Sequence, residues 1–171
     1  MMDRPHYILL PVNPLFIAAT VIGAFLMNLL PWGQWIGVPD FVALVLVFWS
    51  IHQPRKVGIG IAFLMGLLMD VHDANLLGQH ALAYTLLSYF AIMIHRRVLW
   101  FPMTTQALHI FPLLLLAQIV QLVVRLAVSG KFPGWLYFTE SVVAAALWPV
   151  ATWALLAPQR RAIDRDDTRP I

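Results

Sequence analysis

Ionisable side chains within or beside apolar runs are the residues of this sequence that could do chemistry. Asp40, Asp70, Asp73 and Glu140 stand at the ends of such runs, and Arg125 stands within one. A charged group in a bilayer is costly, so these residues indicate either an ion pair or a functional site. We expect the four acids to gather at one face of the membrane, where Arg125 would pair with Asp70 or Glu140.

A polar stripe leads along one predicted helix to Arg125. Gln118, Gln121 and Arg125 are separated by three and four residues, which places them on one helical face. Together with Asp40 and Glu140 they form a predicted intramembrane polar cluster. Two interpretations stay open: a structural ion pair that fixes helix packing, or a polar site that opens to the outer face.

A second stripe surrounds Asp70. Phe63, Gly66 and Asp70 again follow spacings of three and four, and Gly78 and His80 come shortly afterwards. A glycine on a helix face allows another helix to approach closely. These five residues are therefore candidates for helix packing or for contact with a partner.

The polar string around Asp70 also admits a metal-binding alternative. Asp70, His72, Asp73 and His80 carry oxygen and nitrogen atoms of the kinds that bind transition metals. Their spacing matches no standard metal motif. A tight polar turn, with Asp73 or Asn75 capping the next helix, explains these residues without an ion. The sequence therefore predicts no metal and no cofactor.

Six apolar runs must position these side chains. The chain has 171 residues, of which 61% are hydrophobic and 11% charged, whereas soluble domains average about 45–50% apolar and about 25% charged. The composition predicts an all-α polytopic membrane protein with six transmembrane helices in one domain, residues 1–158. The charged tail, residues 159–171, is expected to be disordered. The predicted spans are residues 14–30, 39–52, 57–70, 76–94, 103–128 and 135–157.

The second and third runs are shorter than the roughly 20 residues that a helix needs to cross a bilayer. They can still cross if neighbouring helices shelter their polar ends from lipid. The alternative is that the two runs form a re-entrant hairpin, which would leave four true spans.

Basic residues set the predicted orientation. With six crossings and a cytoplasmic N-terminus, every Lys and Arg except Arg125 and Lys131 would lie on the cytoplasmic side, as the positive-inside rule requires. Both termini are therefore predicted in the cytoplasm. The basic pairs between the runs suit anionic lipids, so the formal net charge of +3 gives no reason to expect nucleic acid as a partner.

Catalytic signatures are missing from the sequence. It contains neither G-x-S-x-G nor H-E-x-x-H, and it has no cysteine for thiolate chemistry. The segment from Gly66 to Asp70 does not make the short Gly-x-Gly-Asp signature of intramembrane aspartyl proteases. The sequence therefore predicts a protein that is not an enzyme.

A series of short motifs in fixed order carries a family resemblance. Their order and spacing resemble the rod shape-determining protein MreD family, specifically over about a quarter of the chain and loosely over most of it. The motifs are Pro39-Asp40, then Gln53-Pro54-Arg55-Lys56 with Gly58, then Phe63-x-x-Gly66-Leu67-x-x-Asp70, then Leu77-Gly78-x-His80-Ala81-Leu82.

The resemblance implies a non-enzymatic subunit of the bacterial elongation machinery in the inner membrane. MreC is the partner it implies first, followed by MreB, RodZ, the RodA glycosyltransferase and a class B penicillin-binding transpeptidase. It also implies a fold similar to the substrate-binding subunits of energy-coupling-factor vitamin transporters. No catalytic residue is carried over from the family.

Two functions follow as hypotheses. In the first, the chain is a scaffold that binds MreC and helps to position peptidoglycan synthases, which maintains rod shape. In the second, it is a small-molecule-binding subunit of a transporter with an outward-facing pocket, a reading supported by the polar cluster around Arg125. A shared fold cannot separate the two.

Overall fold

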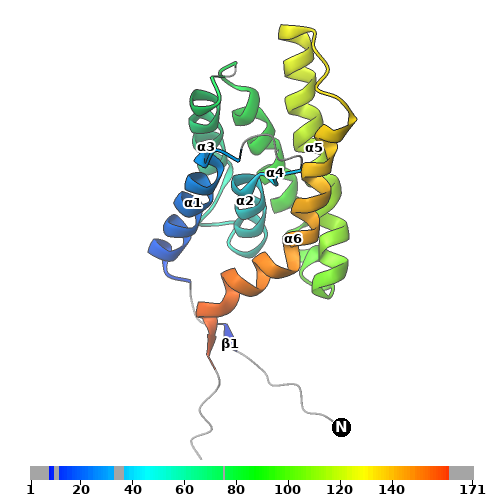
Figure 1. Ribbon diagram of the computed structural model, residues 1–171. Coiled ribbons are helices and arrows are strands. Elements are labelled where there is room, and N and C mark those ends of the chain that lie inside the picture. The colour runs from blue at the N-terminus through cyan, green and yellow to red at the C-terminus, as the bar shows by residue number, and fades with distance from the viewer. Residues whose placement is uncertain (1–7, 10–11, 33–36, 75, 162–171) are drawn as a thin grey trace, which may run out of the picture.

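The computed structural model describes residues 8–9, 12–32, 37–74 and 76–161. Within this part the chain forms six α-helices, which confirms the predicted helical class (Figure 1). Two one-turn 3-10 helices, η1 (Trp135–Phe138) and η2 (Ala157–Gln159), flank the last of them. The six are α1 (Pro14–Leu29), α2 (Phe41–His52), α3 (Ile59–His72), α4 (Gln79–Val98), α5 (Met103–Ser129) and α6 (Thr139–Leu156).

A pair of two-residue strands joins the two ends of the described chain. β1 (Ile8–Leu9) runs antiparallel to β2 (Arg160–Arg161). The sequence predicts no strand, because two residues are too few to give a strand pattern. The last residue of η2, Gln159, and the two residues of β2 are the first residues of the tail for which the sequence predicts disorder, and the rest of that tail lies outside the described residues.

Successive helices run in opposite directions, so each side of the bundle collects one end of every helix (Figure 1). We call the side that carries the β1–β2 pair the terminal end, and the opposite side the polar end. The polar end collects the last residues of α1, α3 and α5 and the first residues of α2, α4 and α6. Asp40, Asp70, Asp73 and Glu140 belong to these helix ends, so the chain path brings the four acids together as expected.

α2 is the central helix of the bundle. It packs against α1, α4, α5 and α6, and side chains such as Leu46, Phe48 and Trp49 are fully buried. Its 12 residues rise only about 18 Å, less than the ~30 Å apolar layer of a bilayer. Protein rather than lipid surrounds this helix, so its polar ends are sheltered although it is short.

α3 lies so close to α4 that their contact requires a glycine. A Cβ atom on Gly66 would lie 2.5 Å from the backbone nitrogen of Ala81 and 2.7 Å from the carbonyl carbon of His80. These backbone atoms cannot rotate away as a side chain could. Gly66 therefore sets the distance between the two helices, as small residues do between membrane helices.

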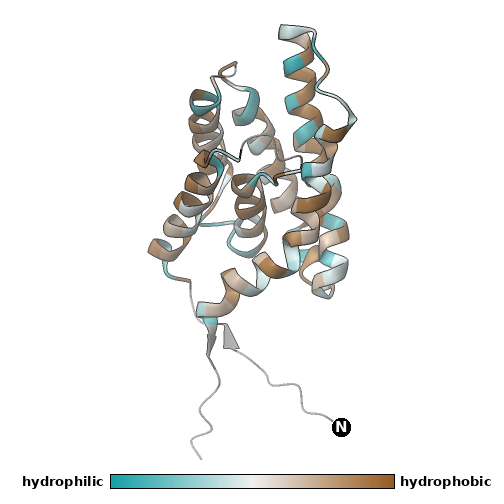
Figure 2. Cartoon of the chain, in the orientation of Figure 1, coloured by the Kyte–Doolittle hydropathy of each residue, from teal (hydrophilic) through white to brown (hydrophobic). Residues whose placement is uncertain are grey.

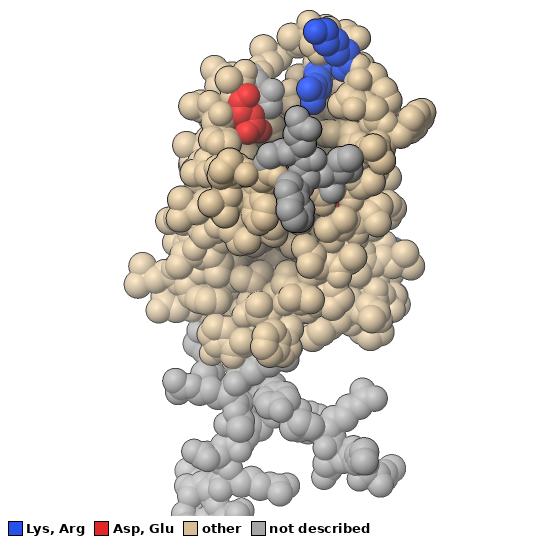
Figure 3. Space-filling view, in the orientation of Figure 1, with Lys and Arg blue, Asp and Glu red and all other residues tan. Residues whose placement is uncertain are grey.

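The outer surface of the bundle is largely apolar. Exposed large hydrophobic side chains occur on every helix except α2, among them Ile22, Leu64, Met93, Val123 and Trp153, and Figure 2 shows hydrophobic residues along the outer helices of the bundle. Figure 3 shows charged side chains of the described residues gathered at the polar end of the face drawn. Soluble monomers rarely expose large continuous apolar patches, whereas lipid-facing helices do.

Two segments are long and apolar enough to cross a membrane, Met103–Ser129 and Trp135–Gln159. α1, α2 and α3 are shorter apolar helices. α4 has 20 residues and ends in the basic segment His95-Arg96-Arg97. The structure thus gives a bundle of apolar helices of unequal length, with the shortest one at its centre.

Candidate functional site

Asp40 organises the centre of the polar end. Its Oδ1 accepts the backbone N–H of Ala43 at 3.0 Å, which caps α2, and the side-chain amide of Asn28 in α1 at 2.8 Å. Its Oδ2 accepts the hydroxyl of Tyr84 in α4 at 2.5 Å. One carboxyl group thus joins three helices through neutral donors, and it makes no ion pair with any described residue.

Asp70 is fully buried where α3 meets α4. Its Oδ2 accepts the backbone N–H groups of Gly78 at 2.8 Å and Ala81 at 3.3 Å, and its Oδ1 accepts that of His80 at 2.7 Å. The His80 ring nitrogen Nδ1 lies 2.9 Å from the same Oδ1. Asp70 therefore satisfies the first N–H groups of α4, where a negative charge is also favoured by the helix dipole.

This arrangement corrects the predicted cap of α4. The helix begins after Gly78, which has a φ of +106° that glycine adopts without strain. The cap comes across the turn from Asp70 rather than from Asp73, and Asn75 lies outside the described residues. A cap supplied by the preceding helix leaves no local sequence signal.

The described residues give no support to the metal-binding alternative around Asp70. Asp73 accepts from His72 at 2.8 Å, and its other oxygen lies 3.7 Å from His80. No group of three or more His, Asp or Glu side chains in the described ranges has a geometry that could hold a metal ion.

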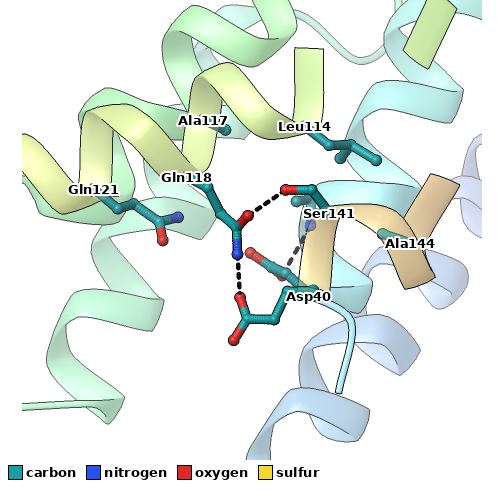
Figure 4. A pocket seen from close by; sticks show the side chains of 9 residues that line it. Asp40, Leu114, Ala117, Gln118, Gln121, Ser141 and Ala144 are labelled. Atoms are coloured by element: carbon teal, nitrogen blue, oxygen red, sulfur yellow. Dashed lines mark hydrogen bonds between the residues drawn. The ribbon is translucent and has the colours of Figure 1, made fainter. Parts of the chain in front are cut away.

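Gln118 links α5 to α6 next to Asp40 (Figure 4). Its amide nitrogen donates to Glu140 Oε2 and to the Tyr137 carbonyl, both at 2.8 Å, and its amide oxygen accepts from the Ser141 hydroxyl. One turn further along α5, Gln121 accepts from the Tyr137 hydroxyl at 3.0 Å. The predicted polar stripe thus faces α6 at this level.

Arg125, the last member of the stripe, does not make the expected ion pair. It pairs with neither Asp70 nor Glu140 among the described residues. Asp70 is enclosed by the start of α4, and Glu140 is held by Gln118. Arg125 is exposed, near the end of α5 that extends beyond the other helices (Figure 1).

A cavity of about 420 Å³ opens between these groups. The ends of all six helices line it, so it lies at the polar end of the bundle. The lining residues include the acids Asp40, Asp73 and Glu140, the basic residue Arg125, the amides Asn28, Gln79 and Gln121, and the aromatics Trp32 and Tyr137. The predicted polar cluster therefore borders a polar cavity, and Gln118 lies beside it on a smaller one that also touches Asp40.

Comparison with known proteins decides the family. The sequence model of the rod shape-determining protein MreD family matches residues 8–155. The chain is also 31% identical over 139 residues to the rod shape-determining protein MreD of Haemophilus influenzae, which covers 78% of this chain and 82% of that protein. The chain belongs to the MreD family.

MreD proteins are non-enzymatic shape-determining proteins, so the prediction that this chain is not an enzyme is confirmed. No solved structure matches the fold. The expected likeness to substrate-binding subunits of energy-coupling-factor transporters therefore gains no support.

Two of the four motif segments that carry the resemblance, residues 63–70 and 77–82, meet at the α3–α4 junction. Gly66, Asp70 and His80 are buried there, and Gly78 lies between them at the turn. Phe63 differs from the others, because its side chain is 46% exposed on the outer face of α3. In this MreD-family chain, three of the five candidates are thus buried in the bundle, Gly78 forms the turn at its edge, and Phe63 faces outward.

Sequence reasoning missed several groups at the site. Asn28, Gln79, Tyr84 and Tyr137 all bond to the acids or line the cavity. Asn28 gave a usable signal, since it is a polar residue inside an otherwise apolar run. The two tyrosines gave none, because tyrosine is common both in membrane interfaces and in cores.

Proposed function

We propose that this MreD-family chain is a scaffold of the cell-elongation complex in the bacterial inner membrane. It binds MreC and helps to position peptidoglycan synthases, which maintains rod shape. The observation that carries this proposal is the compact bundle itself: within the described residues, short connections join the helices and no separate domain projects from them. Any influence on wall synthesis must then pass through partners that contact the helices.

The proposal includes six crossings with both termini in the cytoplasm. Support comes from the distribution of charge, because Arg55, Lys56 and Arg96 lie at the terminal end, whereas the acids lie at the polar end. Basic residues are enriched on the cytoplasmic side of membranes, where they would also contact anionic lipids.

The lack of cysteine makes this topology testable. Single cysteines in place of Arg55 and Lys131 can be exposed to a membrane-impermeant maleimide in intact spheroplasts. Lys131→Cys should react directly, and Arg55→Cys should react only after permeabilisation. The reverse pattern, or equal reaction of both, would contradict the six-span topology.

The outer face of α3 is the surface we propose for the membrane helix of MreC. Phe63 and Leu64 are exposed there, as is Leu68 one turn later. A Cβ atom on Gly60, one turn before Leu64, would meet nothing within 4 Å. A partner helix could therefore approach closely at Gly60 and pack against the apolar side chains beyond it.

Photo-crosslinking tests this surface. A photoreactive phenylalanine analogue at Phe63 should crosslink to MreC in growing cells. The matched control is the same analogue at Leu108, which is also exposed but lies on α5. Equal crosslinking from both positions, or none from Phe63, would reject α3 as the contact surface.

The wider complex follows from family context. MreB, RodZ, RodA and a class B penicillin-binding transpeptidase are the further partners we propose. The transport alternative rests on the polar cavity and requires a different set of proteins. Co-purification with a pair of ATPases instead of wall-synthesis proteins would favour it.

A further inference from the structure

We infer that the polar cavity binds a small zwitterion of the amino-acid type, which carries one ammonium and one carboxylate group. This inference goes beyond the scaffold function and does not depend on it. The cavity has a volume of about 420 Å³, within the range of roughly 300–1,000 Å³ typical of ligand sites. Its lining is mostly polar, which disfavours an apolar ligand.

The carboxyl groups provide the ammonium side of the site. Asp40 and Glu140 both line the cavity, and neither makes an ion pair with a described residue. The described hydrogen bonds of Glu140 involve only Oε2, which accepts from Gln118. An ammonium group between Asp40 and Glu140 would donate charge-assisted hydrogen bonds to both, and such bonds are stronger than neutral ones.

Arg125 provides the carboxylate side. It lines the same cavity and also makes no ion pair with a described residue. A guanidinium group has a planar fork of donors that matches a carboxylate with two parallel hydrogen bonds. A simple cation would leave Arg125 without a partner in the cavity. A simple anion would be repelled by the three acidic residues of the lining, Asp40, Asp73 and Glu140.

The Gln79 side chain is a further polar group at the cavity. Gln79 is only 6% exposed and lines the cavity, and its one described hydrogen bond is made by its backbone N–H, to the Leu76 carbonyl. Buried polar groups are normally hydrogen-bonded. A polar ligand in the cavity would supply a hydrogen-bond partner for the Gln79 amide.

Calorimetry on the purified full-length chain in detergent tests the inference with three matched probes. Glutamine carries both charges, glutaramate lacks the ammonium group, and 4-aminobutanamide lacks the carboxylate. Glutamine should bind saturably, and each analogue should bind at least about tenfold more weakly, because each loses one charge-assisted contact. No saturable heat with glutamine, or equal affinity for all three probes, would overturn the inference.

Variants assign the two ends of the ligand. Arg125→Gln should abolish the preference for glutamine over 4-aminobutanamide, whereas Lys131→Gln, at a basic residue that does not line the cavity, should keep it. Glu140→Gln should abolish the preference over glutaramate. Glu140 also accepts a hydrogen bond from Gln118, so its replacement could disturb the fold. Arg125 is exposed, so the comparison of Arg125→Gln with Lys131→Gln is the decisive one. Unchanged probe preference in Arg125→Gln would reject the assignment.

Discussion

Replacement of Gly66 by alanine should destabilise the bundle through the α3–α4 contact. The new Cβ would lie 2.5 Å from the nitrogen of Ala81 and 2.7 Å from the carbonyl carbon of His80, both in the backbone of α4. The helices must therefore separate by several tenths of an ångström or more. Overpacking of this kind costs about 1–3 kcal/mol.

The separation would also disturb Asp70, which spans the same junction. Asp70 accepts the N–H groups of Gly78, His80 and Ala81, and hydrogen bonds to a charged group contribute about 1.5–3 kcal/mol each. Partial loss of one such bond adds to the overpacking cost, while alanine regains up to about 1 kcal/mol of helix propensity. We expect a net loss of about 2–3 kcal/mol.

Thermal unfolding in detergent measures this effect. A loss of that size should lower the Tm by about 5–10 °C for a chain of this length. Gly60→Ala is the matched control, because it lies on the same helix and its Cβ would meet nothing within 4 Å. If Gly66→Ala melts together with Gly60→Ala and with the parent protein, glycine is not what sets the α3–α4 distance.

Three further substitutions separate buried from exposed polar groups. Asp70→Asn should lower the free energy of unfolding by about 2–4 kcal/mol, because charge-assisted bonds to α4 are lost, and a Tm equal to that of Asp73→Asn would contradict this. The free energy of unfolding of Arg125→Ala should stay within about 0.5 kcal/mol of that of the parent protein, since the residue is exposed and makes no ion pair with a described residue. A large drop in Tm would instead support the ion pair that the sequence predicts. Tyr84→Phe removes a buried hydroxyl that donates to a carboxylate and should cost about 1–3 kcal/mol, whereas Tyr89→Phe, at an exposed position, should cost little by the same melting assay.

Hydrophobic patterning carried much of the fold prediction. Apolar runs bounded by proline, glycine and charge located the helices, because each break in the pattern is a local property of the chain. The run predicted over residues 57–70 corresponds to α3 (Ile59–His72), and the run predicted over 103–128 corresponds to α5 (Met103–Ser129). Helix alternation then placed the four acids at one end without any knowledge of packing.

Pairing between side chains could not be predicted in the same way. The sequence offers Arg125 as the obvious partner for Asp70, yet the carboxylate is satisfied by N–H groups of α4. That choice depends on the close approach at Gly66, which is a property of tertiary structure. Likewise, the burial of α2 explains why a helix of 12 residues suffices, and no local pattern reveals that it is central.

The scaffold function is tested most directly by what the chain binds in its own membrane. The protein can be tagged at its C-terminus, extracted from native membranes in mild detergent and analysed by mass spectrometry. Our account predicts recovery of MreC together with the elongation synthases, and a reduced yield of both from a Phe63→Ala variant that still folds. Recovery of paired ATPases, or of no wall-synthesis protein, would contradict it.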